Sequence, residues 1–199
     1  MARLALNKSS LTRQTRQLKS YQEFLPSLDL KRRQLIQEYS KARRMFSDTR
    51  ERLKDLDPLI AERLPMLSGE RVVLSGIAKI RGVDLAEENV MGTRLPRLEE
   101  VHFDVHDYGL LGKPHWVDNT VAFLKQALTL RVEAQIAERR MELLGEAVRT
   151  ITQRVNLFDK VLIPRTRAHI KKIRIYLSDG ERAAVVRSKL AKAKKAAAS

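Results

Sequence analysis

Cysteine is absent from the 199 residues of this chain, and glycine, proline and aromatic residues are scarce. Without cysteine, disulfides and thiolate metal sites are excluded, and the composition fits a cytosolic protein. The 8 glycines and 6 prolines allow few turns, so long helices are favoured over a sheet of many strands. No apolar run reaches the roughly 18 residues that cross a bilayer, and no signal-peptide pattern is present. The sequence therefore predicts a soluble intracellular chain.

Positive charge is what the chain has in excess, with 39 basic and 24 acidic side chains and a formal net charge of +15. Residues 1–68 carry a net charge of +7 and residues 119–199 carry +11, whereas residues 69–118 carry −3. A basic excess of this kind indicates a polyanionic partner, which is a nucleic acid, a membrane surface or an acidic protein surface.

Two stripes of apolar residues indicate two long helices. The first stripe runs from Leu11 to Leu64 with spacings of three, four and seven, a heptad-like pattern. At 1.5 Å per residue, a helix over this stretch would be roughly 80 Å long and could not bury its stripe inside a small globule. The second stripe, from Val121 to Leu162, supplies a partner of similar length. We therefore expect an all-α dominated fold, a long antiparallel two-helix coiled coil.

Between the stripes the chain changes character. Residues 69–117 contain six of the eight glycines, together with short runs of Val, Ile and Leu. This pattern predicts a short β-hairpin at the turning end of the coiled coil. The expected organisation is one structural unit in three parts: an N-terminal helix over 1–68, an insertion over 69–117, and a C-terminal helix with a basic tail over 118–199.

Pro26 and Pro164 each interrupt an expected helix. Proline lacks an N–H and crowds the carbonyl four residues back, which costs roughly 3 kcal/mol in a helix interior. If the chain turns between residues 68 and 118, antiparallel pairing puts Pro26 opposite residue 160, about four positions from Pro164. We therefore expect both prolines to bend the coiled coil at one height. The same register leaves a loose, lysine-rich C-terminal tail beyond the N-terminus.

The stretch HFDVHD is the strongest candidate for chemistry. His102, Asp104 and His106 would share one face of a strand and could hold a metal, with Asp107 beside them. The spacing matches no familiar metal site, and polar residues alternating on an exposed strand need no ligand, so we expect no metal. Phosphate-binding glycine loops and nucleophile motifs are also absent from the sequence. We therefore expect no cofactor and no enzymatic activity of the chain alone.

The basic tail has two interpretations on composition. It is either a disordered, solvated tail or a segment that binds nucleic acid. The sequence has no zinc finger, no RNP motif and no basic region leading into a zipper. A nucleic-acid-binding coiled coil and a structural or adaptor coiled coil nevertheless remain the alternative functions.

Several motifs together resemble the D subunit of V-type (A-type) rotary ATPases, the central rotor shaft. The tract VNLFDKVLIP is similar to the family pattern, and IKKI and Glu181–Arg182 follow it. The segment ENVMGTRLP resembles the family's N-x-M-G-x-x-x-P, and the start of the chain looks like the N-terminal helix of bacterial members. One departure is Gly180, which replaces a helix former. The motif positions are Asn89, Met91, Gly92, Pro96, Asn156, Ile163 and Pro164.

The resemblance implies a non-catalytic shaft whose paired termini enter a hexameric catalytic head of A and B subunits. ATP hydrolysis there turns the shaft and a membrane rotor ring that moves H⁺ or Na⁺, and the reverse direction makes ATP. A small F subunit on the coiled coil and a funnel-shaped subunit below it are the other implied partners, without nucleic acid or membrane insertion. The implied location is the cytoplasmic face of the inner membrane. The basic residues expected to contact the head are Lys171, Lys172, Arg174, Arg182 and Arg187.

Overall fold

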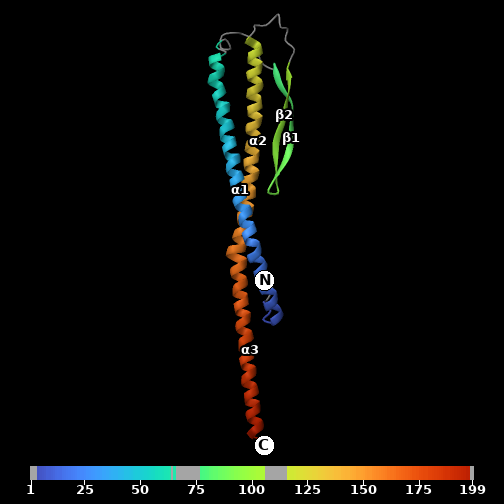
Figure 1. Ribbon diagram of the computed structural model, residues 1–199, viewed down its shortest axis with the longest axis vertical. Helices are drawn as coiled ribbons and strands as arrows, with labels where there is room; N and C mark the ends of the chain where they lie inside the picture. Colours follow the sequence, from blue (N-terminus) through green and yellow to red (C-terminus); the bar gives the residue numbers. More distant parts are fainter. Residues whose placement is uncertain (1–3, 64, 66–76, 106–115, 198–199) are drawn as a thin grey trace. The chain divides into compact units, whose positions relative to one another are not determined.

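Helices dominate the computed structural model of the chain, which describes residues 4–63, 65, 77–105 and 116–197. In chain order the elements are α1 (Lys8–Arg63), β1 (Ala78–Val90), β2 (Thr93–Val105), α2 (Trp116–Asn156), the π-helix η2 (Leu157–Leu162) and α3 (Ile163–Ala197) (Figure 1). The predicted fold class is confirmed, with an N-terminal helix, a long C-terminal helical stretch and an antiparallel hairpin between them in sequence. Each strand has 13 residues, which exceeds the typical length of about 5–6.

Two compact units divide the chain. Unit 1 combines residues 1–32 with residues 150–199, and unit 2 comprises residues 33–149. Helices α1 and α2 each contribute to both units. Each unit therefore contains one segment from the N-terminal helix and one from the C-terminal helical stretch.

In unit 2, the second part of α1 runs antiparallel to α2. A Cβ added at Gly145 would lie 3.4 Å from Cε2 of Tyr39, and the guanidinium of Arg63 lies 5.9 Å from the ring centroid of Phe123. Residue numbers rise along α1 as they fall along α2, and both contacts lie within two residues of the predicted register. The buried apolar side chains of this helix pair include Leu35, Ala42, Leu56, Leu130, Val132, Ala137 and Leu144.

The hairpin of unit 2 pairs β1 with β2 along their whole length, from Ala78 opposite Val105 to Val90 opposite Thr93. The register shifts twice along β1, and such bulges increase the twist of a two-stranded ribbon. A hairpin of two strands is only marginally stable alone. At the root of this hairpin, Val105 packs against a buried cluster that consists of Ile77, Trp116, Val117 and Val121. This cluster anchors the root of the hairpin within unit 2.

In unit 1, the first part of α1 pairs with η2 and α3. Asn7 caps α1, because its Oδ1 accepts a hydrogen bond of 2.7 Å from the N–H of Ser10. The ring of Tyr21 meets Phe158 of η2 edge-on, with centroids 5.4 Å apart. Buried side chains from the C-terminal stretch line this pair, namely Ile151, Val155, Ile163, Thr166, Ile170 and Ile173.

A π-helical turn lies directly before Pro164. The N–H of Ile163 donates to the carbonyl of Phe158, five residues back, as in a π-helix. Pro164 lies, as expected, inside a helical stretch that runs without interruption from Trp116 to Ala197, and the hydrogen bonds shift to the π-helical pattern directly before the residue that has no N–H to donate. Pro26, in contrast, lies inside α1 without a break in the helix. A shared bend at the two prolines remains a prediction.

The lysine-rich end of the chain is helical, so the expectation of a loose tail is wrong. Helix α3 continues through Gly180 as far as Ala197, because alanine, lysine, arginine and leucine all favour helix in this stretch. Side chains of residues 179–196 are all exposed, so no other described part of the chain covers them. The positive charge at this end is carried by an ordered helix.

Replacing Gly180 by Ala should stabilise this end of α3 by about 0.5–1 kcal/mol, because alanine loses less backbone entropy in a helix. A Cβ added at Gly180 meets no atom within 4 Å, so no steric cost opposes the gain. Hydrogen exchange of the amides near residue 180 measures the effect. Gly145→Ala is the control, with a smaller net gain because its Cβ would lie against Tyr39. Faster exchange in Gly180→Ala would contradict a continuous helix.

Candidate functional site

The net positive charge of the chain belongs to unit 1. Residues 1–32 and 150–199 together carry 20 basic and 5 acidic side chains, whereas residues 33–149 carry 19 of each. The whole formal charge of +15 is thus the charge of unit 1, and unit 2 is neutral overall. The charge counts for residues 1–68 and 119–199 did not reveal this division, because each of these segments contributes residues to both units. A surface with one dominant sign attracts a partner of the opposite sign.

A groove of about 350 Å³ lies between α1 and α3 in unit 1. Its basic residues Arg167, Lys171 and Arg174 are spaced four and three residues apart, which places them on one face of α3. Arg167 was missed by sequence reasoning, although its spacing from Lys171 would have revealed it. The remaining lining residues are Thr15, Leu18, Ile170 and Ile175. The groove therefore offers three cationic groups beside aliphatic side chains, without an acidic residue in its lining.

The structure brings together only part of the predicted head-contact set. Lys171 and Arg174 line the same groove. Lys172 is exposed on α3 outside this lining, and Arg182 and Arg187 lie on the exposed stretch of α3 toward its C-terminal end. All five side chains are exposed, as a contact with another protein requires.

The motif from Asn89 to Pro96 forms the tip of the hairpin in unit 2. Met91 and Gly92 have φ angles of 52° and 82°, which fit a two-residue type I′ turn. Oδ1 of Asn89 accepts a hydrogen bond of 2.9 Å from the N–H of Gly92 and so closes the turn. Glycine adopts positive φ without strain, but methionine rarely does. The motif thus specifies the tight turn through Asn89 and Gly92.

Arg140 of α2 holds the hairpin near its tip. One guanidinium nitrogen donates to the backbone carbonyl of Pro96 at 3.0 Å, and the other donates to Oε2 of Glu88 at 2.9 Å. Leu95, beside Pro96, is only 1% exposed. Sequence reasoning missed Arg140, because no local pattern connects it to a residue 44 positions away.

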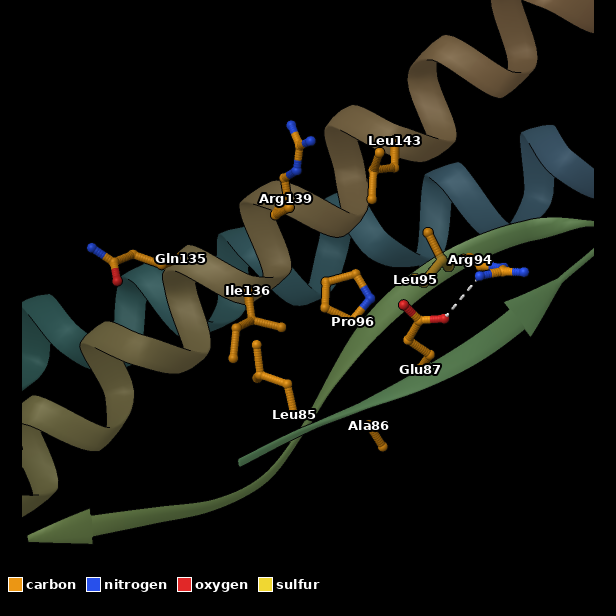
Figure 2. A pocket seen from close by; sticks show the side chains of 10 residues that line it. All are labelled: Leu85, Ala86, Glu87, Arg94, Leu95, Pro96, Gln135, Ile136, Arg139 and Leu143. Atoms are coloured by element: carbon orange, nitrogen blue, oxygen red, sulfur yellow. Dashed lines mark ion pairs between the residues drawn. The ribbon is translucent and has the colours of Figure 1, made fainter. Parts of the chain in front are cut away.

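A second groove, of about 510 Å³, lies between the hairpin and α2 (Figure 2). Its walls are largely apolar, and the dashed line in Figure 2 marks an ion pair of 3.6 Å between Glu87 and Arg94 at its side. The lining residues are Leu85, Ala86, Glu87, Arg94, Leu95, Pro96, Gln135, Ile136, Arg139 and Leu143. This set offers no nucleophile beside a general base, so it suits packing against another surface better than catalysis.

The HFDVHD stretch is described only in part, since His106 and Asp107 lie outside the described residues. No group of three metal-binding side chains occurs in the described ranges. Instead, Nε2 of His102 lies 2.8 Å from Oδ2 of Asp84 across the hairpin. This hydrogen bond and the charge of Asp84 raise the pKa of His102 above its ordinary value of 6.5.

The pair of His102 and Asp84 predicts a pH-dependent interaction within the hairpin. The pKa of His102 is raised in the folded state, so the pair stabilises the hairpin fully below pH 6.5 and loses this effect as the pH rises through the folded pKa. NMR titration of the His102 ring should give a midpoint above 6.5, and Asp84→Asn should lower it toward that value. The carboxylate of Glu100 lies 4.0 Å from Nδ1 of His102, so Glu100→Gln should lower the His102 midpoint by less than Asp84→Asn does. Equal midpoints in the wild type and Asp84→Asn would refute the pairing.

Comparison with known proteins decides the family of the chain. The family model described as the D subunit of ATP synthase matches residues 10–193. The chain belongs to this family. The D subunit of the V-type ATP synthase of Borreliella burgdorferi is 34% identical over 192 residues, covering 96% of this chain and 95% of that protein. Proteins of the same name from Chlamydia trachomatis and Chlamydia muridarum are 33% and 32% identical, and each alignment covers 97% of this chain and 96% of the relative. The predicted resemblance is confirmed.

The residues of the family motifs lie in both units of the structure. The hairpin tip with Asn89, Met91, Gly92 and Pro96 lies in unit 2. In unit 1, Asn156 ends α2, the 6% exposed Ile163 begins α3, and the exposed Pro164 follows it. The family match extends over both units, so the nucleic-acid-binding and adaptor alternatives are not favoured.

Proposed function

We propose that this chain is the central shaft of a V-type ATP synthase. It couples ATP hydrolysis or synthesis in a catalytic head to ion movement through a membrane rotor ring. The observation that carries this proposal is the family match over residues 10–193, together with relatives named as D subunits of V-type ATP synthases over nearly their whole lengths. The chain takes no direct part in the chemistry, which belongs to the head.

The helices suit the transmission of torque. A shaft must resist twisting and bending, so its helices need continuous hydrogen bonding and lateral packing. Helix α1 has 56 residues without a break. In each unit, the helix that pairs with α1 contributes buried apolar side chains. Pro26 and the η2–Pro164 junction are the sites at which we expect a bend, because prolines and π-helical turns are common causes of helix kinks. A bend would make the shaft asymmetric, so that it acts differently on each catalytic site.

Unit 1 is the end that we assign to the catalytic head of A and B subunits. Its charge of +15 and the exposed residues of α3 beyond residue 178 suit a cavity with acidic walls. Lys171, Lys172, Arg174, Arg182 and Arg187 are the proposed contacts. Because exposed ion pairs individually contribute about 0–1 kcal/mol, the summed field and not one residue determines this interaction.

Unit 2 is the part that we assign to the other subunits of the rotor. A small F subunit would bind its helix pair, and a funnel-shaped subunit would bind its turning end. In the described ranges, no helix is both long and apolar enough to span a membrane. From the names of its relatives, which are subunits of V-type ATP synthases, we propose a peripheral place on the cytoplasmic face of the inner membrane, held there by the complex.

Copurification followed by mass measurement of the intact complex tests this function. A tag on the chain should recover the subunits of the catalytic head in fixed stoichiometry, and nuclease treatment should leave the recovery unchanged. Recovery of nucleic acid in place of those subunits, with loss after nuclease treatment, would favour the alternative function and refute the proposal.

A further inference from the structure

Buried side chains recur every seven residues along α2 as far as η2. A repeat of seven keeps one face of a helix turned to its partner. The half-buried Phe158 continues this series, and its next member would be Arg165. Arg165 is exposed, however, and the buried residue is Thr166. The repeat is therefore one residue longer at this point. The fully buried members before Phe158 are Leu130, Ala137, Leu144 and Ile151.

A second series of buried residues contains the same step. Ile163 follows Val155 after eight positions, and Ile170 follows Ile163 after seven. Thr166 and Ile173 are likewise seven positions apart. The spacing of seven thus resumes after η2, and the extra residue lies between Val155 and Ile163.

The π-helical turn of η2 accommodates this extra residue. The N–H of Ile163 donates to the carbonyl of Phe158, five residues back, whereas an α-helix would use the carbonyl four residues back. Each hydrogen-bonded turn of this kind encloses one residue more than a turn of α-helix. None of the six residues of η2 is buried, and Leu157 and Val161 are 46% and 47% exposed. The chain therefore takes up a residue here without adding a buried side chain to the contact with α1.

The extra residue decides which side of α3 meets α1. Without it, the repeat of seven would turn the positively charged side chains of Arg165 and Lys172 toward α1. Burying a charge without a partner is strongly unfavourable, because the charge loses its hydration. With the extra residue, both charged side chains are exposed and aliphatic residues are buried in their place, namely Ile163, Ile170 and Ile173.

The same rotation positions the cations of the basic groove. Arg167, Lys171 and Arg174 each follow a buried residue by one position, which is about 100° around the helix. They therefore lie at the edge of the contact with α1, beside Thr15 and Leu18. Without the extra residue, each would lie two positions, or about 200°, from a residue turned to α1. The groove would then lose its cations.

We infer that the extra residue in η2 sets the rotational phase of α3, and that Pro164 is not the cause of the π-helical turn. The extra residue turns the aliphatic side of α3 to α1 and holds the three cations at the edge of this contact. This inference concerns the chain alone and goes beyond the proposed function, so its tests need no partner subunit.

Deleting Val161 tests this role of η2, because the exposed Val161 lies within the π-helical turn. The deletion is made together with Pro164→Ala, so that a continuous α-helix can form. It restores the repeat of seven and leaves the same side chains against α1. The unfolding temperature of the purified chain should therefore stay within about 4 °C of that of Pro164→Ala alone.

Deleting the exposed Thr150, also in Pro164→Ala, is the matched control, because the repeat of seven is regular there. This deletion would turn Ile151, Val155 and Phe158 away from α1 and put the polar residue that follows each of them in its place. The unfolding temperature should fall by about 10 °C or more, since several apolar contacts are lost together. Equal losses from the two deletions would overturn the inference.

Thiol labelling measures the phase of α3 directly, because the chain has no other cysteine. Lys172→Cys should react at least about tenfold faster than Ile173→Cys, since Lys172 is exposed and Ile173 is 0% exposed. This order should persist in Pro164→Ala, both alone and with Val161 deleted. Protection of the Lys172→Cys thiol in Pro164→Ala would show that the proline maintains the π-helical turn. Protection in the deletion variant would show that α3 has rotated, and either result would overturn the inference.

Discussion

Reversing Lys171, Lys172 and Arg174 to Glu should remove most assembly of this chain with the catalytic head at low salt. Each reversal changes the charge by two, so unit 1 falls from +15 to +9. Lys171 and Arg174 also share the groove beside α1, where the variant would place carboxylates. We expect the fraction of chain recovered with the head to fall about tenfold or more, because several weak contacts are lost and reversed together.

Salt dependence separates this electrostatic effect from misfolding. The difference between variant and wild type should be largest at low ionic strength, where the screening length is longest, and should shrink in high salt. Arg43, Arg44 and Arg50 provide a matched control, since they are exposed on the α1 segment of the neutral unit 2. Their reversal to Glu makes the same change in charge and should affect head assembly much less. Equal losses from the two triple variants would contradict the assignment of unit 1 to the head.

Ile173→Ala should lower the free energy of unfolding of the isolated chain by about 2–5 kcal/mol. Ile173 has an exposed fraction of 0%, so its truncation removes buried apolar surface and leaves a cavity in unit 1. The higher helix propensity of alanine recovers only about 0.5 kcal/mol of this loss. Chemical denaturation followed by circular dichroism measures the change.

Ile175→Ala is the matched control, two residues along the same helix with 53% of its surface exposed. Its effect on unfolding should stay within about 0.5 kcal/mol. In the assembled complex, Ile173→Ala should reduce coupling between hydrolysis and ion transport, because α3 would be held less firmly against α1. If the two variants were equally stable, α3 would not be packed through Ile173 as described.

The long-range pairing of the helices was predictable because antiparallel pairing follows from simple periodicity. Leu35, Ala42 and Leu56 belong to the predicted stripe and are buried. The contacts of Tyr39 with Gly145 and of Arg63 with Phe123 keep the predicted register in unit 2. The six glycines of residues 69–117 likewise indicated where the hairpin lies, but they did not indicate how long its strands are.

Local backbone geometry and contacts between distant residues were not predictable in the same way. The π-helix before Pro164 shifts the buried face by one residue, so that Ile163 is buried and Leu162 of the predicted stripe is only half-buried. Because both residues are apolar, the sequence pattern does not reveal this shift. The order of α3 beyond Gly180 was underestimated, because one glycine costs only about 1 kcal/mol and the surrounding residues favour helix. Arg140 joins residues that are far apart in the sequence, and only the fold brings them together.

Observing the rotation of this chain is the most direct test of its role as a shaft. Lys54→Cys would introduce a single thiol on an exposed position of α1 in unit 2, to which a bead or gold particle can be attached. The catalytic head is fixed to a surface, and the particle is followed while ATP is supplied. The account predicts rotation in one direction that stops when ATP is withdrawn. A particle that remains stationary while the same complexes hydrolyse ATP would contradict it.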